Sequence, residues 1–366
     1  MIQILPYTEQ HTGAVRAFNE RMRTGKAPTD FLLPESVGPE GSGPVRATQF
    51  VVVEQEDVRG GFIEFIYPGW VNGSEQTVAN YQSPLSEGIH DRRYTLISLQ
   101  MIQHIQQRQP YVFMVGMGDP GRPLPRLLQA FGWEVFPVPF LFRVENAARF
   151  LREIAPLRTG GVKRSLARAA ALTGAGSVAS RAWRALSVPA WTASRRYTIE
   201  PIDNWGPWAD SIWEQFRSHC SLAVVRNSAT LPALYPLGSG RVLGWMVKSG
   251  AEPVGWVTGL STQMENNHYF GNLRVGTVLD CIAPPHALAA TAWLATRSLA
   301  RTGADIVLTN QQHLMWRTAF KQAGFIQASS NYLLGISKRL TEASRHSGGH
   351  DAIHITRGDG DGSVHL

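Results

Sequence analysis

The stretch from Gly276 to Ser337 alternates apolar strand patterns with helix patterns, and this alternation limits the folds open to the chain more than any other feature. The expected elements are, in order, a strand over 277–282, a helix over 287–301, a strand over 305–309 that ends at Asn310, a helix through Trp316 and Phe320 that Ala323-Gly324-Phe325 closes, and a strand over 332–336. Strands that alternate with helices pair in parallel. We therefore expect an α/β fold in which helices flank a mixed central sheet.

The first half of the chain repeats this order. Its expected elements are strands over 49–54, 61–67 and 77–82, a helix over 94–107, a strand over 111–115, a helix over 124–131 and a strand over 136–143. Gly61 aligns with Gly255 at an offset of 194 residues, and Gly132 aligns with Gly324 at an offset of 192. A nearly constant offset indicates two tandem copies of one fold.

This order, with Asn310 ending the middle strand and Ala323-Gly324-Phe325 ending the second helix, resembles the C-terminal half of the GNAT family, the acyl-CoA-dependent N-acyltransferases. The pair of copies is similar to double-GNAT proteins. The resemblance implies two tandem GNAT-like domains, each a mixed central sheet flanked by helices. It also implies acetyl-CoA or another acyl-CoA as the cofactor.

The chain divides by composition into four expected parts. These are a domain over 1–150, a basic linker rich in Ala, Gly and Arg over 151–195, a domain over 196–340 and a flexible polar tail over 341–366. A length of 366 residues suits two domains, and 43% hydrophobic against 17% charged residues indicates globular, core-forming halves. Cys220 and Cys281 lack the spacing of metal ligands, so we expect neither a zinc site nor a disulfide framework.

Positive charge is concentrated in the linker. Between Glu153 and Glu200 there are eight basic residues and no acidic one, which leaves the rest of a chain of net charge +7 nearly neutral. A solvated linker helix accounts for this pattern, and docking on an anionic membrane surface is the main alternative. Nucleic acid fits poorly, because basic residues interleaved with alanine lack aromatic platforms for bases. Since no signal peptide or membrane-spanning run is apparent, we expect a cytoplasmic protein, membrane-peripheral where the linker docks.

The resemblance places the cofactor's pyrophosphate at a loop before a helix, where backbone N–H groups favour anions. The residues expected to contact the cofactor are Leu85, Ser86, Gly88, Ile89, His90, Arg92 and Arg93, with Asn310 on the pantetheine side. The matching loop of the second copy, 284–290, has no glycine, which favours the first copy. Two simpler interpretations stay open: Asn310 as a helix cap, and the two arginines as exposed residues at a helix start.

Acyl transfer to an amine also needs a base for the amine's proton. The candidates are Glu64 on a strand of the first copy, His90 and His313 near helix starts, and Asp280, which interrupts an apolar strand of the second copy. Asp280 could equally be a structural, hydrogen-bonded carboxylate. The family often has a Tyr, four residues before its Gly-Phe pair, that protonates the leaving thiolate. Leu128 and Phe320 occupy those positions, so the usual acid is missing.

These features predict an N-acyltransferase that moves an acyl group from acyl-CoA to an amine of a small molecule, glycan or peptide, with one copy catalytic and the other structural. One alternative is a Fem-like aminoacyl transferase that takes its acyl group from a charged tRNA, which the basic linker favours. The other is a non-catalytic GNAT-fold binding or scaffold protein in envelope or polysaccharide assembly. The unusual cofactor loops and the missing Tyr favour that second alternative.

Overall fold

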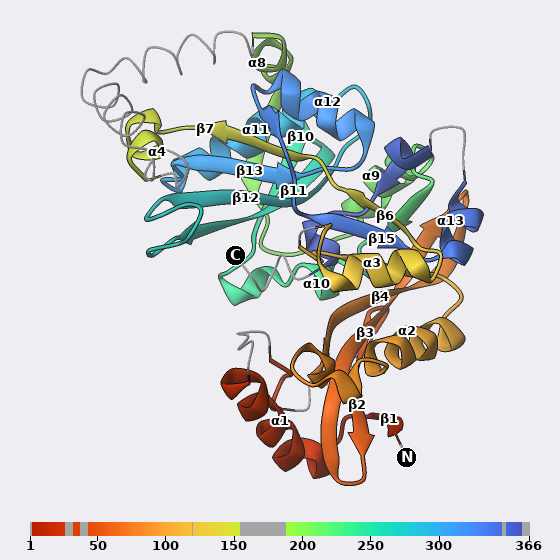
Figure 1. Ribbon diagram of the computed structural model, residues 1–366. Coiled ribbons are helices and arrows are strands. Elements are labelled where there is room, and N and C mark those ends of the chain that lie inside the picture. The colour runs from red at the N-terminus through yellow and green to blue at the C-terminus, as the bar shows by residue number, and fades with distance from the viewer. Residues whose placement is uncertain are drawn as a thin grey trace. The chain divides into compact units, whose positions relative to one another are not determined.

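The computed structural model describes residues 2–25, 32–36, 43–118, 120–153, 188–345 and 349–360 (Figure 1). The chain divides into two compact units, each formed from two stretches of sequence. Unit 1 comprises Met1–Pro137 with Leu333–Arg345, and unit 2 comprises Val138–Tyr332 with His346–Leu366. Each unit contains a mixed sheet flanked by helices, which confirms the expected fold class.

The sheet of unit 1 starts as an antiparallel meander and becomes mixed at its centre. Its strands, in spatial order, are β1 (Ile2–Pro6), β2 (Arg46–Glu54), β3 (Asp57–Val71), β4 (Ser74–Ser86), β5 (Val112–Val115), β15 (Leu333–Ile336) and β6 (Glu134–Pro137). β4 and β5 are parallel, and the other neighbours are antiparallel. From β2 to β5 the unit therefore has the strand order that the sequence pattern predicts.

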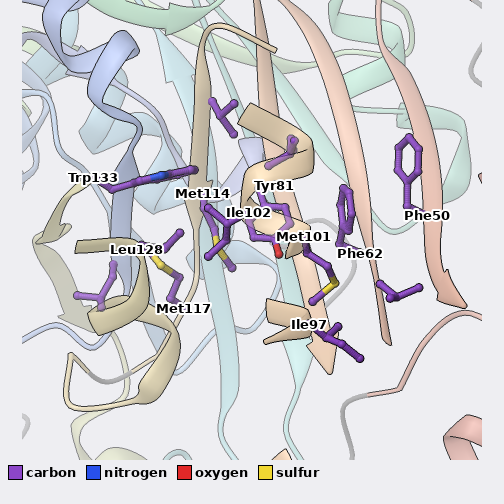
Figure 2. Close-up of a cluster of buried hydrophobic side chains, with 14 of the residues drawn as sticks. Phe50, Phe62, Tyr81, Ile97, Met101, Ile102, Met114, Met117, Leu128 and Trp133 are labelled. Carbon is purple, nitrogen blue, oxygen red and sulfur yellow. The ribbon is translucent and has the colours of Figure 1, made fainter. Parts of the chain in front are cut away.

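Different helices cover the two faces of this sheet. α1 (Thr12–Thr24) contributes to a cluster that includes Val51, whereas α2 (Ile97–Arg108) and α3 (Pro123–Ala130) contribute to a second cluster that includes Phe50 and Val52 (Figure 2). Neighbouring residues of a strand point to opposite faces, so a continuous apolar run on β2 supplies both clusters.

The sheet of unit 2 has the same plan. Its strands, in spatial order, are β14 (Ile326–Ala328), β7 (Phe140–Val144), β13 (Ile306–Asn310), β12 (Arg274–Ile282), β11 (Glu252–Gln263), β10 (Leu243–Ser249) and β8 (Tyr197–Pro201). β12 and β13 are parallel, as β4 and β5 are in unit 1. The helices among its described residues are α4 (Ala147–Glu153), α8 (Val188–Ser194), α9 (Trp208–Arg217), α10 (Leu231–Leu234), α11 (Leu288–Arg301) and α12 (Leu314–Gln322).

Shorter elements complete the two units. They are the short strands β9 (Leu222–Val224) and β16 (Ile353–His354), the helix α13 (Lys338–Ser344), and the 3-10 turns η1 (Glu9–His11), η2 (Glu87–Ile89), η3 (Arg92–Tyr94), η4 (Leu237–Ser239), η5 (Gly349–Ala352) and η6 (Arg357–Asp359). η2 and η3 lie in the predicted cofactor loop of the first copy, and η5, β16 and η6 lie in the predicted tail.

The two glycine anchors occupy equivalent places, with one shifted by a residue. Gly132 and Gly324 end α3 and α12 with φ angles of 79° and 86°, a left-handed conformation that glycine adopts without strain. A Cβ on Gly255 would lie 3.1 Å from Thr291 of α11, and a Cβ on Gly60 would lie 3.2 Å from Ile97 of α2. Gly60, not Gly61, therefore has the environment of Gly255.

The expected strand over 136–143 is two strands that belong to different units. β6 ends at Pro137 and pairs with β15, whereas β7 begins at Phe140 and pairs with β13 and β14. Pro137 and Pro139 have no N–H to donate, so one regular strand does not run through both. The first repeat thus supplies β7 to unit 2, and the second repeat supplies β15 to unit 1. These units differ from the expected contiguous domains 1–150 and 196–340.

The expected linker and tail are described only in part. Most of 151–195, with six of its eight basic residues, lies outside the described residues, so the membrane hypothesis for the linker stays a prediction. The tail expected to be flexible contains the end of α13 and an ordered, largely buried segment over 353–359. Among the described residues, no helix is long and apolar enough to cross a membrane, and no group of His, Cys, Asp and Glu could hold a metal ion.

Candidate functional site

Each sheet opens where its two parallel strands part. In unit 1 the parallel pairing is limited to Ala79 with Val112 and Asn80 with Phe113. Beyond these pairs β4 continues beside β3 and β5 continues beside β15. We call the parted ends, 81–86 on one side and 114–117 on the other, the first split. Backbone groups between parted strands no longer pair with each other, so such a place can receive a ligand.

A bulge lies on the β4 side of the first split. Phe62 of β3 faces two residues of β4, Ser83 and Pro84, because the register shifts there. Ser83 is exposed and has a φ of 49°, a left-handed conformation that is strained for a residue with a side chain. Strain of this kind is often retained where the backbone must present its polar groups to a ligand.

Ion pairs, a hydrogen bond and tight packing fix the conformation of the loop that follows β4. Glu87 is buried and forms ion pairs with Arg21 at 2.8 Å and Arg59 at 3.1 Å. The Ser86 hydroxyl accepts a hydrogen bond from the Gly88 N–H at 3.1 Å. A Cβ on Gly88 would lie 2.7 Å from the Tyr94 carbonyl oxygen, so only glycine fits without a shift of the backbone.

The predicted cofactor residues of this loop divide into packing and exposed positions. Leu85 is buried against α1, whereas Ile89 is 55% exposed. Arg93 is exposed and bonds to the Asp91 carboxylate at 2.5 and 2.9 Å, which lowers the pKa of Asp91. Arg92 is exposed and forms no ion pair with another described residue. Arg92 is therefore the side chain of this loop that is available to an anion.

The two candidate bases of unit 1 have different surroundings. Glu64 is inaccessible to solvent and pairs with Arg108 at 3.1 Å, so its charge is already compensated. His90 lies against Gly25 at the end of α1, where a Cβ would be 2.8 Å from the ring. Both ring nitrogens of His90 are shielded from solvent and have no hydrogen-bond partner among the described residues. Such unpaired buried atoms are uncommon and mark His90 as the better candidate.

The second split lies between β12 and β13 of unit 2. The parallel pairing covers Val275–Thr277 and ends at Leu308, after which β12 follows β11 and β13 follows β7. The chain's own segment 353–359 contacts both parted strands. His354 lies 2.9 Å from Asp280 on β12, and Arg357 donates to the Asn310 side chain on β13 at 3.1 Å.

Asp280 is the centre of a buried ionic network. Its carboxylate accepts hydrogen bonds from Arg226 at 2.6 Å and from the Tyr235 hydroxyl at 2.7 Å, in addition to its contact with His354. Burial raises the pKa of Asp280, but the charge of Arg226 and the contact with His354 outweigh it and leave this pKa well below its ordinary value. With its lone pairs engaged, Asp280 fits the structural interpretation better than that of a base.

Asn310 and His313 are both buried and bonded to other groups of unit 2. Asn310 is buried, donates weakly to the Val138 carbonyl at 3.4 Å and accepts from Arg357. It does not cap α12, whose N-cap is His313. The His313 ring is buried and bonds through Nε2 to the His219 carbonyl at 2.9 Å. Burial is the main cause that lowers the pKa of His313 to about 4.

The sequence did not identify four members of this network, namely Arg226, Tyr235, His354 and Asp359. Two of them carried a local signal: Arg226 follows the apolar run 222–225, and His354 lies between Ile353 and Ile355. A charged or polar side chain inside an apolar run needs a partner. Their common partner, Asp280, is 54 and 74 residues away in the chain, which no local pattern reveals.

Comparison with solved structures identifies the fold. A GCN5-related N-acetyltransferase from Anabaena variabilis aligns over 94% of this chain and 75% of its own at 12% identity, with a TM-score of 0.51. Saccharomyces cerevisiae N-myristoyltransferase with bound myristoyl-CoA aligns over 92% and 79% at 10% identity, with a TM-score of 0.51. A probable N-acyltransferase from Enterococcus faecalis aligns over 94% and 74% at 9% identity, with a TM-score of 0.50. No protein-family model and no curated protein matches the chain.

The chain has a tandem GNAT fold. At 9–12% identity the likeness concerns the fold alone, and it covers residues of both units. The two GNAT copies share their sheet plan but differ at the split. In the GNAT copy of unit 1 the bulge at Ser83 is exposed, whereas the copy of unit 2 has residues 353–359 against both strands. Leu128 and Phe320, where the family often has a Tyr, are fully buried core residues in the two copies.

Proposed function

We propose that this chain is an N-acyltransferase that transfers the acyl group of an acyl-CoA to an amine, and that the cofactor binds at the first split. The observation that carries the proposal is the difference between the two splits of one GNAT-fold chain. The first presents an exposed bulge at Ser83 and the loop before α2, and the second is filled by residues 353–359. On this proposal one copy is catalytic and the other is structural.

The proposed reaction replaces a thioester by an amide. The amine nitrogen attacks the thioester carbonyl carbon, a C–N bond forms, and the C–S bond breaks to release CoA. The amine must lose a proton, and His90 is the base that we propose, because its ring nitrogens are not committed to another described residue. The departing thiolate of CoA takes up a proton. Positioning of amine and thioester supplies the remaining rate enhancement.

Arg92 supports the binding of the cofactor's phosphates. Arg92 starts the 3-10 turn η3 and is exposed. An arginine can bind a phosphate oxygen through two N–H groups. Acetyl-CoA is the donor that we propose to test first, with myristoyl-CoA beside it, and the acceptor is an amine of a small molecule, glycan or peptide.

Calorimetric titration with acetyl-CoA, myristoyl-CoA and free CoA tests the proposal. We expect saturable binding with a stoichiometry near one. Arg92→Glu should weaken binding by about tenfold or more, because it removes one charge-assisted contact and adds a repulsive charge. Arg301→Glu, an exposed position at the end of α11, is the matched control and should bind like the unaltered chain. Equal affinity of both variants would remove Arg92 and this loop from the site.

Two substitutions distinguish the candidate bases once an acceptor amine is found. His90→Asn should lower kcat by about 10²-fold, because the amine then lacks its base. Glu64→Gln should leave kcat nearly unchanged, because Glu64 pairs with Arg108. The opposite pattern would transfer the role to Glu64.

The titration also decides between the proposed donor and the alternatives. No binding of any acyl-CoA, by a chain with a normal melting transition, would contradict the proposal. A charged tRNA would then be the donor to test, as for a Fem-like aminoacyl transferase. A chain that binds neither would be a GNAT-fold binding or scaffold protein.

A further inference from the structure

The segment Ile353–Asp359 is embedded in unit 2 rather than laid on its surface. Ile353 and His354 pair in parallel with Leu222 and Ala223 of β9, and the Ala352 carbonyl accepts a hydrogen bond from the Ser221 N–H at 2.8 Å. Most of the segment is at most 2% exposed, namely Ile353, His354, Ile355, Thr356 and Asp359. The segment therefore binds as an added strand followed by a turn, a common way for a domain to hold a peptide.

Three side chains of the segment contact three different residues at or beside the second split. His354 contacts Asp280 on β12, Arg357 donates to Asn310 on β13, and Asp359 accepts from Arg226 at 2.6 Å. The Arg357 guanidinium also lies 5.0 Å from the centre of the Tyr332 ring. An imidazole, a guanidinium and a carboxylate in this spacing are thus each matched by a complementary group.

Shape adds to this selectivity at Gly358. A Cβ on Gly358 would lie 2.1 Å from the Tyr235 hydroxyl, which is itself fixed by its bond to Asp280. Because Tyr235 is buried and bonded, it cannot move away at small cost. The pattern that the split accepts is therefore His354, then Arg357, Gly358 and Asp359.

We propose that the second copy is a peptide-binding domain, that the second split is its site, and that the ligand is the segment 353–359 of the same chain. The class of ligand is an extended peptide with an imidazole followed by Arg-Gly-Asp in a turn. This proposal does not depend on acyl transfer by the first copy. On this proposal the tail, which the sequence predicts to be flexible, contains the ligand of the second split.

The two native cysteines report on the segment. Cys220 adjoins Ser221, which bonds to Ala352 directly before the segment, and Cys281 adjoins Asp280, which contacts His354; both cysteines are buried, and burial raises the pKa of each thiol. Since the chain has no other cysteine, the rate of labelling of the full-length chain by a thiol reagent measures access to these two places.

The test compares Gly358→Val with Gly238→Val in the full-length chain. Valine at 358 collides with Tyr235 and should release the segment, whereas a Cβ at 238, in the same unit, meets no atom within 4 Å. We expect labelling at least tenfold faster in Gly358→Val and unchanged in Gly238→Val. Arg357→Ala, which adds no bulk, should give an intermediate rate.

A synthetic peptide of residues 349–360 shows whether the opened place is a binding site. Added to the Gly358→Val chain, it should slow labelling in a saturable way toward the rate of the unaltered chain. The same peptide with Val at 358 should have no effect. Unchanged labelling in Gly358→Val would overturn the proposal, and so would faster labelling that the peptide does not reverse. Failure of acyl-CoA to bind would leave these results untouched and would contradict only the acyltransferase function.

Discussion

The Arg226 guanidinium lies 2.6 Å from the Asp280 carboxylate, and both side chains are inaccessible to solvent. Arg226 also pairs with Asp359 at 2.6 Å, so one cation faces two buried carboxylates. Burial raises the pKa of Asp359, and the charge of Arg226 acts against it. Removing a partner of a buried ion pair is costly, because a charge is left without compensation.

Arg226→Met should destabilise the chain more than Asp280→Asn. Loss of the arginine leaves two carboxylates without their cation, whereas loss of the Asp280 charge leaves Arg226 paired with Asp359. We expect a cost of at least about 3–5 kcal/mol for Arg226→Met and less for Asp280→Asn, measured by urea unfolding. Arg217→Met, which removes a partly exposed pair with Glu214, should cost under about 1 kcal/mol. Equal costs at 226 and 280 would contradict the shared-cation arrangement.

The stability of the chain should decrease as the pH falls, over the range between the unfolded and the folded pKa of His313. Its folded pKa of about 4 lies below the ordinary value of 6.5, because burial disfavours the charged ring. The unfolded state therefore binds more protons between pH 6.5 and 4. Stability is fully present above pH 6.5 and is lost as the pH falls toward 4, by about 3 kcal/mol in total.

Thermal or urea unfolding of His313→Gln across this window measures the effect. The variant should lose less stability between pH 6.5 and 4 than the unaltered chain. His268→Gln, at an exposed position, should retain the full pH dependence. A His313→Gln chain with the slope of the unaltered chain would assign the loss to other groups.

How much of this fold the sequence could predict depends on how local each signal is. The elements of 276–337 were predictable because helices and strands of this length impose their own periodicity, and α11 and β13 start and end within about a residue of expectation. The exchange of β7 and β15 between the units was not predictable, because an apolar strand such as Leu333–Ile336 fits either sheet equally well. The tail illustrates the same limit: 341–366 is polar in composition, but its segment 353–359 is buried because it pairs with β9 and binds Arg226 and Asp280.

The candidate site shows a similar division. The sequence singled out Asp280 correctly as a side chain that needs an explanation, but its partners lie far along the chain. It placed Arg92 and Arg93 together as cofactor ligands, and the structure separates them by the pairing of Arg93 with Asp91. That pairing depends on the backbone conformation of the 3-10 turn η3, and the number of charged residues in the sequence does not predict this conformation.

Gly88→Ala should be destabilising even though it adds a single methyl group. The new Cβ would lie 2.7 Å from the Tyr94 carbonyl oxygen and 3.0 Å from the Thr95 Cα, both backbone atoms. We expect a loss of about 1–3 kcal/mol, measured by thermal unfolding. Gly13→Ala in α1, where nothing lies within 4 Å of the new Cβ, should instead stabilise by about 0.5–1 kcal/mol. Equal effects at 88 and 13 would show that the loop is not tightly packed.

The exchange of strands predicts how the first half behaves alone. A fragment of residues 1–150 contains β6 and β7 but lacks β15, the strand that joins β5 to β6 in unit 1. It should therefore show no cooperative melting transition, since it also exposes an apolar sheet edge.

A redesigned fragment should restore the transition. Leu333 lies directly opposite Pro137 in the antiparallel pair of β6 and β15. A short turn such as Asn-Gly can therefore join residue 137 to residue 333 as a hairpin. Residues 1–137 joined in this way to 333–345 should melt cooperatively and give a dispersed NMR spectrum, because every strand of unit 1 is then present. A cooperative fragment 1–150, or a redesigned fragment that stays unfolded, would contradict the exchange and would favour contiguous domains.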